Sequence, residues 1–388
     1  MFKLGIVINF HKDRWYGGYN HFITLIKYLR KFKKDIKIVI FTDNKKNLLT
    51  DSFFKKHSVI ETNLVSNEKF LLRIFLKISI ILFGKSNLLD SFFLNKVDIV
   101  SHYLYLGKKS KIKSMPWFPD FQEIYYPKNF TLRARVFRRL KVLISAIHAT
   151  AIIVSSKCAM NDLKKISNKA YKKSILIRHT ADLPDTKSII SINKIKKKYN
   201  IDKNFFYLPN AYWVHKNHIV VLKALKFLKG NSNILIISSG QSLDPKSPNH
   251  FKKLLQYIKD EKLSKNYRYL GIIPRKDNLS LMYHTMAVIN PSTFEGWSST
   301  VEEAKVLCKR VILSNIPPHK EQKAENCYYF GLNDYKKLSK ILNLLLHKNI
   351  IKGDLSKKNI KKIENIHKNN IQDYVAKLAA HIKNKIDI

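Results

Sequence analysis

The sequence predicts an α/β protein in which two doubly wound domains face a central cleft. Two successive series of short apolar runs alternate with stretches of helical periodicity, which is the pattern of parallel sheets covered by helices. A polar segment at residues 179–202, which contains Pro184, separates the two series. The length of 388 residues also exceeds that of one usual compact core. We therefore expect one domain at residues 1–185 and a second at residues 186–388.

The first domain begins with a strand, a glycine-containing loop and a helix, the usual opening of a parallel α/β domain. The strand is expected at residues 4–10, and a helical pattern extends over residues 19–32. The loop between them contains Gly17 and Gly18. Further apolar runs predict strands at residues 36–41, 97–100, 151–156 and 174–178.

The second domain repeats this alternation of strands and helices. Apolar runs predict strands at residues 205–208, 233–238, 267–270 and 287–290. Helical patterns lie at residues 218–228, 249–263 and, with many lysines, 332–386. We expect the last helix of this region to cross back to the first domain if the chain follows the family described below.

The segment at residues 291–304 has the pattern that most strongly indicates a ligand site. It joins the strand expected at residues 287–290 to a helical pattern at residues 301–307. The unpaired amides of a helix start and the helix dipole both favour a bound anion. Three successive residues can cap this helix and present their amides: Ser298, Ser299 and Thr300.

Two glutamates flank this predicted anion site. Glu295 lies in the loop beside the helix start, and Glu303 lies within the helix on the side expected to face the crevice. Carboxylates accept hydrogen bonds from sugar hydroxyls, so a phosphate site with two of them suits a nucleotide sugar. The neighbouring Glu302 is instead expected to be a first-turn acid that stabilises the helix dipole.

Residues 291–304 resemble the E-x7-E signature of the retaining glycosyltransferases of family 4, which have the GT-B fold with two Rossmann-like domains. Residues 311–322, VILSNIPPHKEQ, resemble the strand and loop that follow this signature in many bacterial members. The resemblance implies that Glu303 binds the ribose hydroxyls and that Glu295 binds sugar hydroxyls near the reacting carbon. It also places two residues between these glutamates at the donor: Gly296 and Trp297.

Residues 209–218, PNAYWVHKNH, resemble a segment of the same family in which a lysine meets the donor diphosphate. By that resemblance Lys216 is the cation that stabilises the charge gained by a leaving nucleoside diphosphate. Asn210 lies near a position where most relatives carry an arginine, and Arg275 is a candidate to replace that charge. We expect all three side chains to contact the donor.

The resemblance assigns further residues by position. A Gly-Gly pair like Gly17 and Gly18 lets the first domain's backbone approach the sugar diphosphate in this family. Residues 117–127 resemble a Pro-Asp-Phe-Gln-His segment in which Glu123 stands where the family usually has histidine. Glu123 could take over its hydrogen-bonding role, or it could indicate a different sugar or reduced activity. Two residues fall where relatives hold the nucleotide base, usually by main-chain groups: Ser239 and Gly240.

The charge is strongly basic, with 72 Lys and Arg against 28 Asp and Glu and a formal net charge of +44. The sequence has no zinc-finger spacing, aromatic RNA-binding octapeptide or basic zipper, so nucleic acid is not an expected partner. Residues 68–85 place Lys69, Arg73 and Lys77 on one face of an otherwise strongly apolar helix. Such a helix suits a membrane interface or, equally, a buried helix with a solvated basic stripe. We expect compositional bias combined with affinity for an anionic membrane surface.

The remaining expectations concern cofactors, location and reaction. The chain has no Asp-x-Asp motif, no run of 18 apolar residues, no signal-peptide pattern and three scattered cysteines. We therefore expect no metal or other cofactor, and a cytoplasmic protein peripheral to the inner face of the cytoplasmic membrane. The resemblance implies transfer of a hexose from a nucleotide sugar to a saccharide or polyprenyl-diphosphate-linked acceptor in bacterial surface polysaccharide synthesis. Two alternatives stay open: a non-catalytic basic protein that binds anionic membrane or nucleic acid, and a sugar-nucleotide epimerase of the same fold.

Overall fold

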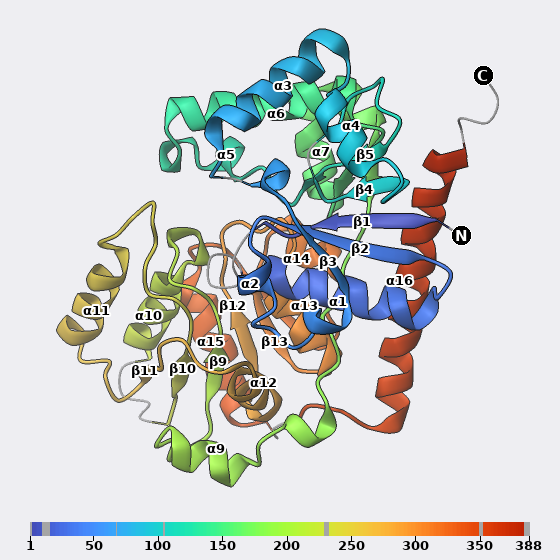
Figure 1. The fold of residues 1–388 in the computed structure, drawn as a ribbon. Helices are drawn as coiled ribbons and strands as arrows, with labels where there is room; N and C mark the ends of the chain where they lie inside the picture. Colours follow the sequence, from blue (N-terminus) through green and yellow to red (C-terminus); the bar gives the residue numbers. More distant parts are fainter. Residues whose placement is uncertain are drawn as a thin grey trace. The chain divides into compact units, whose positions relative to one another are not determined.

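The computed structural model describes residues 2–9, 16–66, 68–103, 105–228, 233–348 and 352–383 (Figure 1). These residues form two compact units, each of which contains parallel strands and helices. Unit 1 comprises Met1–His179 together with Glu364–Ile388, and unit 2 comprises Thr180–Ile363. The chain thus passes into unit 2 after His179, whereas the sequence analysis placed the boundary after residue 185.

Unit 1 contains two parallel sheets, with strand orders β3-β2-β1-β4-β5 and β6-β7-β8. The strands are β1 Lys3–Val7, β2 Lys37–Thr42, β3 Ser58–Glu61, β4 Ile99–Ser101, β5 Lys113–Met115, β6 Trp117–Phe118, β7 Ile152–Val154 and β8 Ser174–Leu176. The α-helices are α1 Tyr16–Phe32, α2 Lys45–Leu48, α3 Phe70–Phe83, α4 Asn87–Phe93, α5 Gln122–Tyr125, α6 Leu132–His148, α7 Lys157–Ile166 and α8 Asn168–Lys172.

Unit 2 has one parallel sheet of six strands in the order β11-β10-β9-β12-β13-β14. The strands are β9 Phe206–Leu208, β10 Ile236–Ser238, β11 Tyr267–Tyr269, β12 Val288–Asn290, β13 Val311–Ser314 and β14 Cys327–Phe330. The α-helices are α9 Ile192–Lys198, α10 His218–Phe227, α11 His250–Asp260, α12 Arg275–His284, α13 Ser299–Val306, α14 Pro317–Glu321 and α15 Tyr335–Leu346. The α/β class with parallel sheets that the sequence predicts is confirmed.

The central strands of unit 2 are apolar on both faces because helices cover both sides of the sheet. In β9, Phe206 and Leu208 belong to one hydrophobic cluster and Tyr207 to another. All three side chains are buried. Successive side chains of a strand point to opposite faces, so the two clusters are the two sides of the sheet. This is why β9 appears in the sequence as a continuous apolar run.

The final helix, α16 Lys357–Lys383, belongs to both units along its length. Its first residues are part of unit 2, and from Glu364 onward the chain is grouped with unit 1. Ile371 and Leu378 lie in the hydrophobic cluster that contains α1 and β1. The Tyr374 hydroxyl donates a hydrogen bond to Ser101 Oγ at 2.8 Å, at the end of β4. The C-terminal segment therefore completes the core of the N-terminal unit.

Some predicted bounds were wrong for identifiable reasons. The run at residues 151–156 forms a strand only over Ile152–Val154, because the Ser156 side chain accepts the Ala159 N–H and caps α7. Helix α1 begins at Tyr16, so Gly17 and Gly18 lie in its first turn rather than in a loop before it. Four further strands, each of two to four residues, were not predicted from the sequence: β3, β5, β6 and β14.

Candidate functional site

The sheet of unit 2 reverses its strand order between β9 and β12. From β9 the chain adds β10 and β11 on one side, and it then returns to place β12 on the other side of β9. The loops after β9 and β12, at residues 209–217 and 291–298, therefore leave the sheet at neighbouring carboxyl ends. In open α/β sheets this switch point is the usual place of a ligand site.

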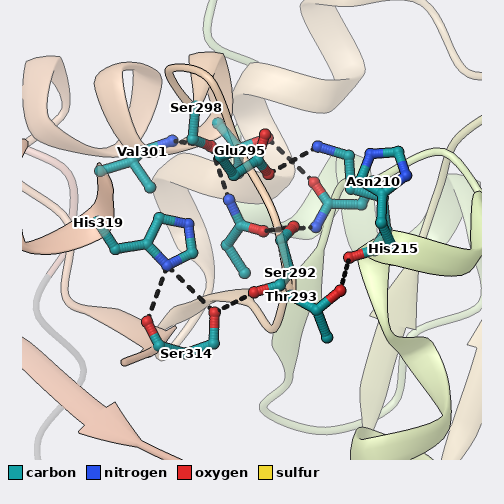
Figure 2. A network of polar contacts seen from close by, with 12 residues as sticks. Asn210, His215, Ser292, Thr293, Glu295, Ser298, Val301, Ser314 and His319 are labelled. Atoms are coloured by element: carbon teal, nitrogen blue, oxygen red, sulfur yellow. Dashed lines mark hydrogen bonds and ion pairs between the residues drawn. The ribbon is translucent and has the colours of Figure 1, made fainter. Parts of the chain in front are cut away.

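Hydrogen bonds join these two loops directly (Figure 2). The Thr293 N–H and hydroxyl both donate to the His215 carbonyl oxygen, at 2.8 and 3.2 Å. The Asn210 side-chain amide donates to Asn290 Oδ1 at 3.0 Å, and Asn217 Nδ2 donates to the Pro291 carbonyl at 3.2 Å. These hydrogen bonds consequently fix the two loops relative to each other at the carboxyl edge of the sheet.

Ser298 caps the helix that follows β12. Its hydroxyl accepts the Val301 N–H at 3.4 Å and a hydrogen bond from Asn290 Nδ2 at 2.6 Å (Figure 2). The Ser298 N–H is itself directed to Gln322 Oε1 at 3.3 Å. The next two amides, of Ser299 and Thr300, start α13 and have no acceptor within the helix by virtue of their position. They are the amides at this helix start that can serve an anion.

Lys216 and Glu295 form an ion pair at the switch point. Lys216 Nζ lies 2.7 Å from Glu295 Oε1, and the two side chains are 15% and 9% exposed. Burial by itself would raise the pKa of Glu295, but the charges of Lys216 and of nearby His319, with the Lys216 hydrogen bond, lower it to about 2. Glu295 is therefore fully ionised at neutral pH and holds the ammonium group in place.

A second ion pair lies on the helix itself. Arg275 Nη1, at the start of α12, contacts Glu303 Oε1 of α13. The Glu303 side chain is 10% exposed and that of Arg275 is 29% exposed. The structure thus brings together two residues that the sequence analysis had assigned separately to the donor. Both predicted site carboxylates of unit 2 meet a cation near the helix start.

Glu302 has a different environment from its neighbour. It is 1% exposed and accepts hydrogen bonds from Gln322 Nε2 at 2.9 Å and from Lys305 at 3.1 Å. These contacts tie α13 to the segment after β13, so Glu302 stabilises the local fold. The distinction between Glu302 and Glu303 follows from the two faces of the helix.

The loop after β10 packs closely against the loop after β9. Gly240 has φ +142°, and a Cβ atom there would lie 2.5 Å from the Asn210 carbonyl oxygen. Glycine is therefore required by both conformation and space. The Ser239 hydroxyl and that of Tyr207 are 2.6 Å apart, and the Ser239 N–H donates to the Leu208 carbonyl. Ser239 is 2% exposed, so these buried contacts hold the start of the loop after β10 against β9.

Two sets of predicted residues lie in unit 1 rather than at this edge. Gly17 and Gly18 are in the first turn of α1. Glu123 is in α5, where its Oε2 atom lies 2.7 Å from Arg138 Nε of α6. Arg138 also contacts Asp120 at 3.3 Å. Glu123 therefore has a fixed cationic partner inside unit 1, which neutralises much of its charge.

Two further residues of the switch point were not assigned by the sequence analysis. His319 is fully buried, and its Nδ1 atom lies 2.9 Å from the Ser314 carbonyl and 3.2 Å from the Ser314 hydroxyl (Figure 2). Burial lowers its pKa, while the charge of Glu295 and the hydrogen bond to the Ser314 carbonyl act in the opposite direction. Gln322 binds both Ser298 and Glu302. Both residues belong to the VILSNIPPHKEQ segment, and the family resemblance of that segment was the signal in the sequence that could have identified them.

Within the described ranges, no group of three or more His, Cys, Asp or Glu side chains has the arrangement of a metal site. The fixed charges at the switch point are those of Lys216, Arg275, Glu295 and Glu303. With the start of α13 they make a polar surface that can bind an anion and accept hydrogen bonds from hydroxyl groups.

Comparison with known proteins shows which family this part of the chain is similar to. Residues 191–380 match the family described as Glycosyl transferases group 1. The O-antigen chain mannosyltransferase RfbU of Salmonella typhimurium is 23% identical over 217 residues, which are 56% of this chain and 56% of the relative. The match therefore spans about half the length of that curated relative.

Solved structures with the same fold cover the whole chain. HepE of Anabaena, crystallised with UDP and glucose, has a TM-score of 0.69 at 15% identity, over 98% of this chain and 100% of its own. A glycosyltransferase of Rickettsia africae ESF-5 has a TM-score of 0.64 at 16% identity, over 100% of this chain and 99% of its own. At these identities the likeness establishes the fold, which is GT-B. The chain thus has the GT-B fold, and its residues 191–380 are similar to the family of glycosyl transferases group 1.

Proposed function

We propose that the chain is a retaining glycosyltransferase that moves a hexose from a nucleotide-diphosphate sugar to a saccharide or lipid-linked acceptor. The observation that carries the proposal is the arrangement at the switch point of unit 2. The start of α13, the Lys216–Glu295 pair and the Arg275–Glu303 pair lie around one carboxyl edge of the sheet. Anion-binding amides, two cations and two carboxylates are groups that can bind a sugar diphosphate.

The donor diphosphate is expected on the amides of Ser299 and Thr300, with Lys216 beside it. Cleavage of the bond between the sugar and the diphosphate leaves an additional negative charge on the leaving phosphate. A fixed ammonium and a helix start stabilise that charge more in the transition state than in the ground state, which accelerates the reaction. The ion pair with Glu295 orients Lys216 before the donor binds.

The two carboxylates have separate tasks in this proposal. Glu303 accepts hydrogen bonds from the ribose hydroxyls, and Glu295 accepts hydrogen bonds from sugar hydroxyls near the reacting carbon. Each has a cationic partner that fixes its orientation. We infer that the positive charges of Lys216 and Arg275 replace a bridging metal ion, so that the reaction requires no metal.

The acceptor and the biological setting are proposals of the same kind. The O-antigen mannosyltransferase relative supports a role in bacterial surface polysaccharide synthesis, and HepE, crystallised with UDP, supports a nucleotide donor. An acceptor carried on a polyprenyl diphosphate would require the protein to work at the anionic inner surface of the cytoplasmic membrane. The basic composition of the chain agrees with that location.

A thermal-shift screen of the purified protein against UDP, GDP and dTDP, each with EDTA present, tests the donor site. We expect one nucleotide family to raise the melting temperature by several degrees, because a ligand that binds the folded state stabilises it. Lys216→Ala and Glu303→Ala should abolish the shift, whereas Lys252→Ala, an exposed lysine of α11, should retain it.

Incubation with the matching nucleotide sugar then distinguishes the reactions that share this fold. Release of free nucleoside diphosphate with an acceptor product of unchanged anomeric configuration, read by NMR, supports a retaining transferase. Conversion of one nucleotide sugar into its epimer would instead assign an epimerase. No shift with any nucleotide would refute the donor site altogether.

A further inference from the structure

The outer face of α3 in unit 1 is apolar along the whole helix. Leu71 is 80% exposed, Phe75 is 60% exposed and Leu82 is 68% exposed. The inner face is apolar as well, since Leu76 and Ile80 are buried in the core of unit 1. A helix that covers a domain core normally has polar residues on its outer side. The amphipathic pattern of an ordinary surface helix is therefore absent from α3.

Helix α6 exposes a second apolar stripe. The residues at successive turns along this stripe are Leu132, Val136, Leu140, Leu143 and Ile147, and all of them are at least one-third exposed. The exposed cations Arg133 and Arg139 lie beside the stripe along the helix. The stripe thus combines large aliphatic side chains with long cationic ones.

These two helices are neighbours within unit 1 (Figure 1). Lys77 Nζ of α3 lies 4.2 Å from the centre of the Phe137 ring of α6. The pKa of Lys141 on α6 is lowered to about 8, by burial and by the charges of Arg138, Lys77 and Arg73. The charges that lower this pKa are cationic, so a nearby anion would oppose their effect. We use the name α3–α6 face for the exposed apolar residues of both helices together with the cations named above: Arg73, Lys77, Arg133, Arg138, Arg139 and Lys141.

We propose that unit 1 docks onto an anionic phospholipid bilayer through the α3–α6 face. The apolar side chains would enter the boundary between headgroups and acyl chains, and the cations would meet lipid phosphates. Charge complementarity favours this partner, because long cationic side chains beside an apolar stripe can extend toward headgroups while their stems stay in the apolar layer. The proposal concerns unit 1 and does not depend on the donor site in unit 2.

The helix dimensions favour docking in the plane of the membrane. The 14 residues of α3 extend about 21 Å at about 1.5 Å per residue, less than the roughly 30 Å of a bilayer's hydrocarbon core. Across the described part of the chain, no helix has both the length and the apolar character needed to cross a membrane. The face is therefore suited to interfacial contact along the two helices.

Co-sedimentation of the full chain with lipid vesicles tests the proposal. Vesicles of phosphatidylcholine alone are compared with vesicles that also contain phosphatidylglycerol, at low and high salt. We expect binding only to the anionic vesicles, with weaker binding at high salt. Leu71→Ser/Leu82→Ser should lower the partition coefficient at least about tenfold, and Arg133→Gln/Arg139→Gln should lower it roughly tenfold or more.

Matched substitutions on unit 2 provide the controls. Leu255→Ser/Leu344→Ser removes two exposed leucines, 43% and 49% exposed, and Lys252→Gln/Lys253→Gln removes two exposed charges. Both control variants should bind anionic vesicles like the wild type. An equal loss of binding in the controls would overturn the proposal, since it would assign binding to overall composition.

Two other results would also overturn it. Equal binding to vesicles of phosphatidylcholine alone and to anionic vesicles would show that the net negative charge of the membrane is not recognised. Self-association of the wild type without lipid, measured by light scattering and abolished by Leu71→Ser/Leu82→Ser, would assign the face to a second copy of the chain. The melting temperature of each variant is measured, and binding is compared only among variants that melt at the wild-type temperature. This control excludes unfolding as the cause of lost binding.

Discussion

The switch point of unit 2 and the α3–α6 face of unit 1 both contain clustered cations, but in different chemical environments. At the switch point, Lys216 and Arg275 each contact a carboxylate, and these carboxylates are almost fully buried. On the α3–α6 face, Lys141 has cationic neighbours and lies beside exposed apolar residues. Fixed ion pairs suit a small ligand with a defined geometry, whereas cations around an apolar face suit an extended anionic surface.

This comparison explains why the net charge of +44 is a poor guide to function. Composition indicates that anions are attracted, but it does not distinguish a nucleotide from a membrane or nucleic acid. The distinction comes from burial and from the partners of each cation. Charge-changing substitutions in the two regions should therefore have effects of different size and kind.

The largest effect is expected for Lys216→Ala. Removing one partner of a buried ion pair leaves Glu295 without its cation, which should lower the free energy of unfolding by roughly 3–5 kcal/mol. Loss of the cation at the leaving phosphate should lower kcat/KM by about 100- to 1,000-fold. Urea unfolding and initial rates measure the two effects. The exposed Lys223→Ala of α10 should change neither quantity appreciably.

The double variant Lys216→Met/Glu295→Gln separates these two effects. It removes both buried charges, so we expect most of the lost stability to return while activity stays low. A double variant that regains activity together with stability would show that Lys216 acts on the fold alone. In that case Lys216 would not differ in function from a cation that only stabilises the fold.

The next effect concerns Glu303, which should bind the ribose. Glu303→Gln weakens two charge-assisted hydrogen bonds, and nucleotide affinity measured by calorimetry should fall about 10- to 100-fold. Glu302→Gln is the matched control, because Glu302 contacts Lys305 and Gln322 instead. We expect it to lower stability without changing nucleotide affinity. Equal affinity losses in both variants would contradict the separation of the two helix faces.

The pKa of Glu295 predicts how stability depends on pH. Its folded-state value of about 2 lies below the usual 4.5, so the ionised group stabilises the fold above pH 4.5. That contribution, roughly 3 kcal/mol, should disappear as the pH falls from about 4.5 toward 2. The stability difference between wild type and Glu295→Gln should therefore shrink on acidification. Glu325→Gln, which removes an exposed carboxylate paired with Lys362, should alter stability only slightly at any pH.

Much of unit 2 could be predicted from the sequence because its strands are buried on both faces. Phe206–Leu208 and Val288–Asn290 appear as uninterrupted apolar runs, and the motifs at their ends marked the loops of the switch point. The partners of the site residues could not be predicted in the same way. The contact of Arg275 with Glu303 joins two helices that start after different strands, and only the folded sheet brings them together.

Unit 1 was harder to predict because local patterns and tertiary contacts disagree there. Glu123 was identified from a local motif, but its ion pair with Arg138 of α6 could not be predicted from that motif. The short edge strands β3 and β5, with the sequences SVIE and KSM, have no clear apolar run. For residues 68–85 the sequence allowed either a buried helix or an interfacial one. The structure shows that α3 is apolar on both sides, which periodicity alone cannot reveal.

The smallest expected effect is that of Leu71→Ser on stability. Leu71 is 80% exposed, so the substitution removes little buried surface and should change the free energy of unfolding by less than about 0.5 kcal/mol. Leu76, on the opposite side of α3, is 4% exposed. The substitution Leu76→Ala should therefore lower the free energy of unfolding by about 2–5 kcal/mol. Urea unfolding without lipid measures both. A large loss for Leu71→Ser would mean that another part of the chain covers the outer side of α3 in solution, and the contrast between the two regions would then need a different explanation.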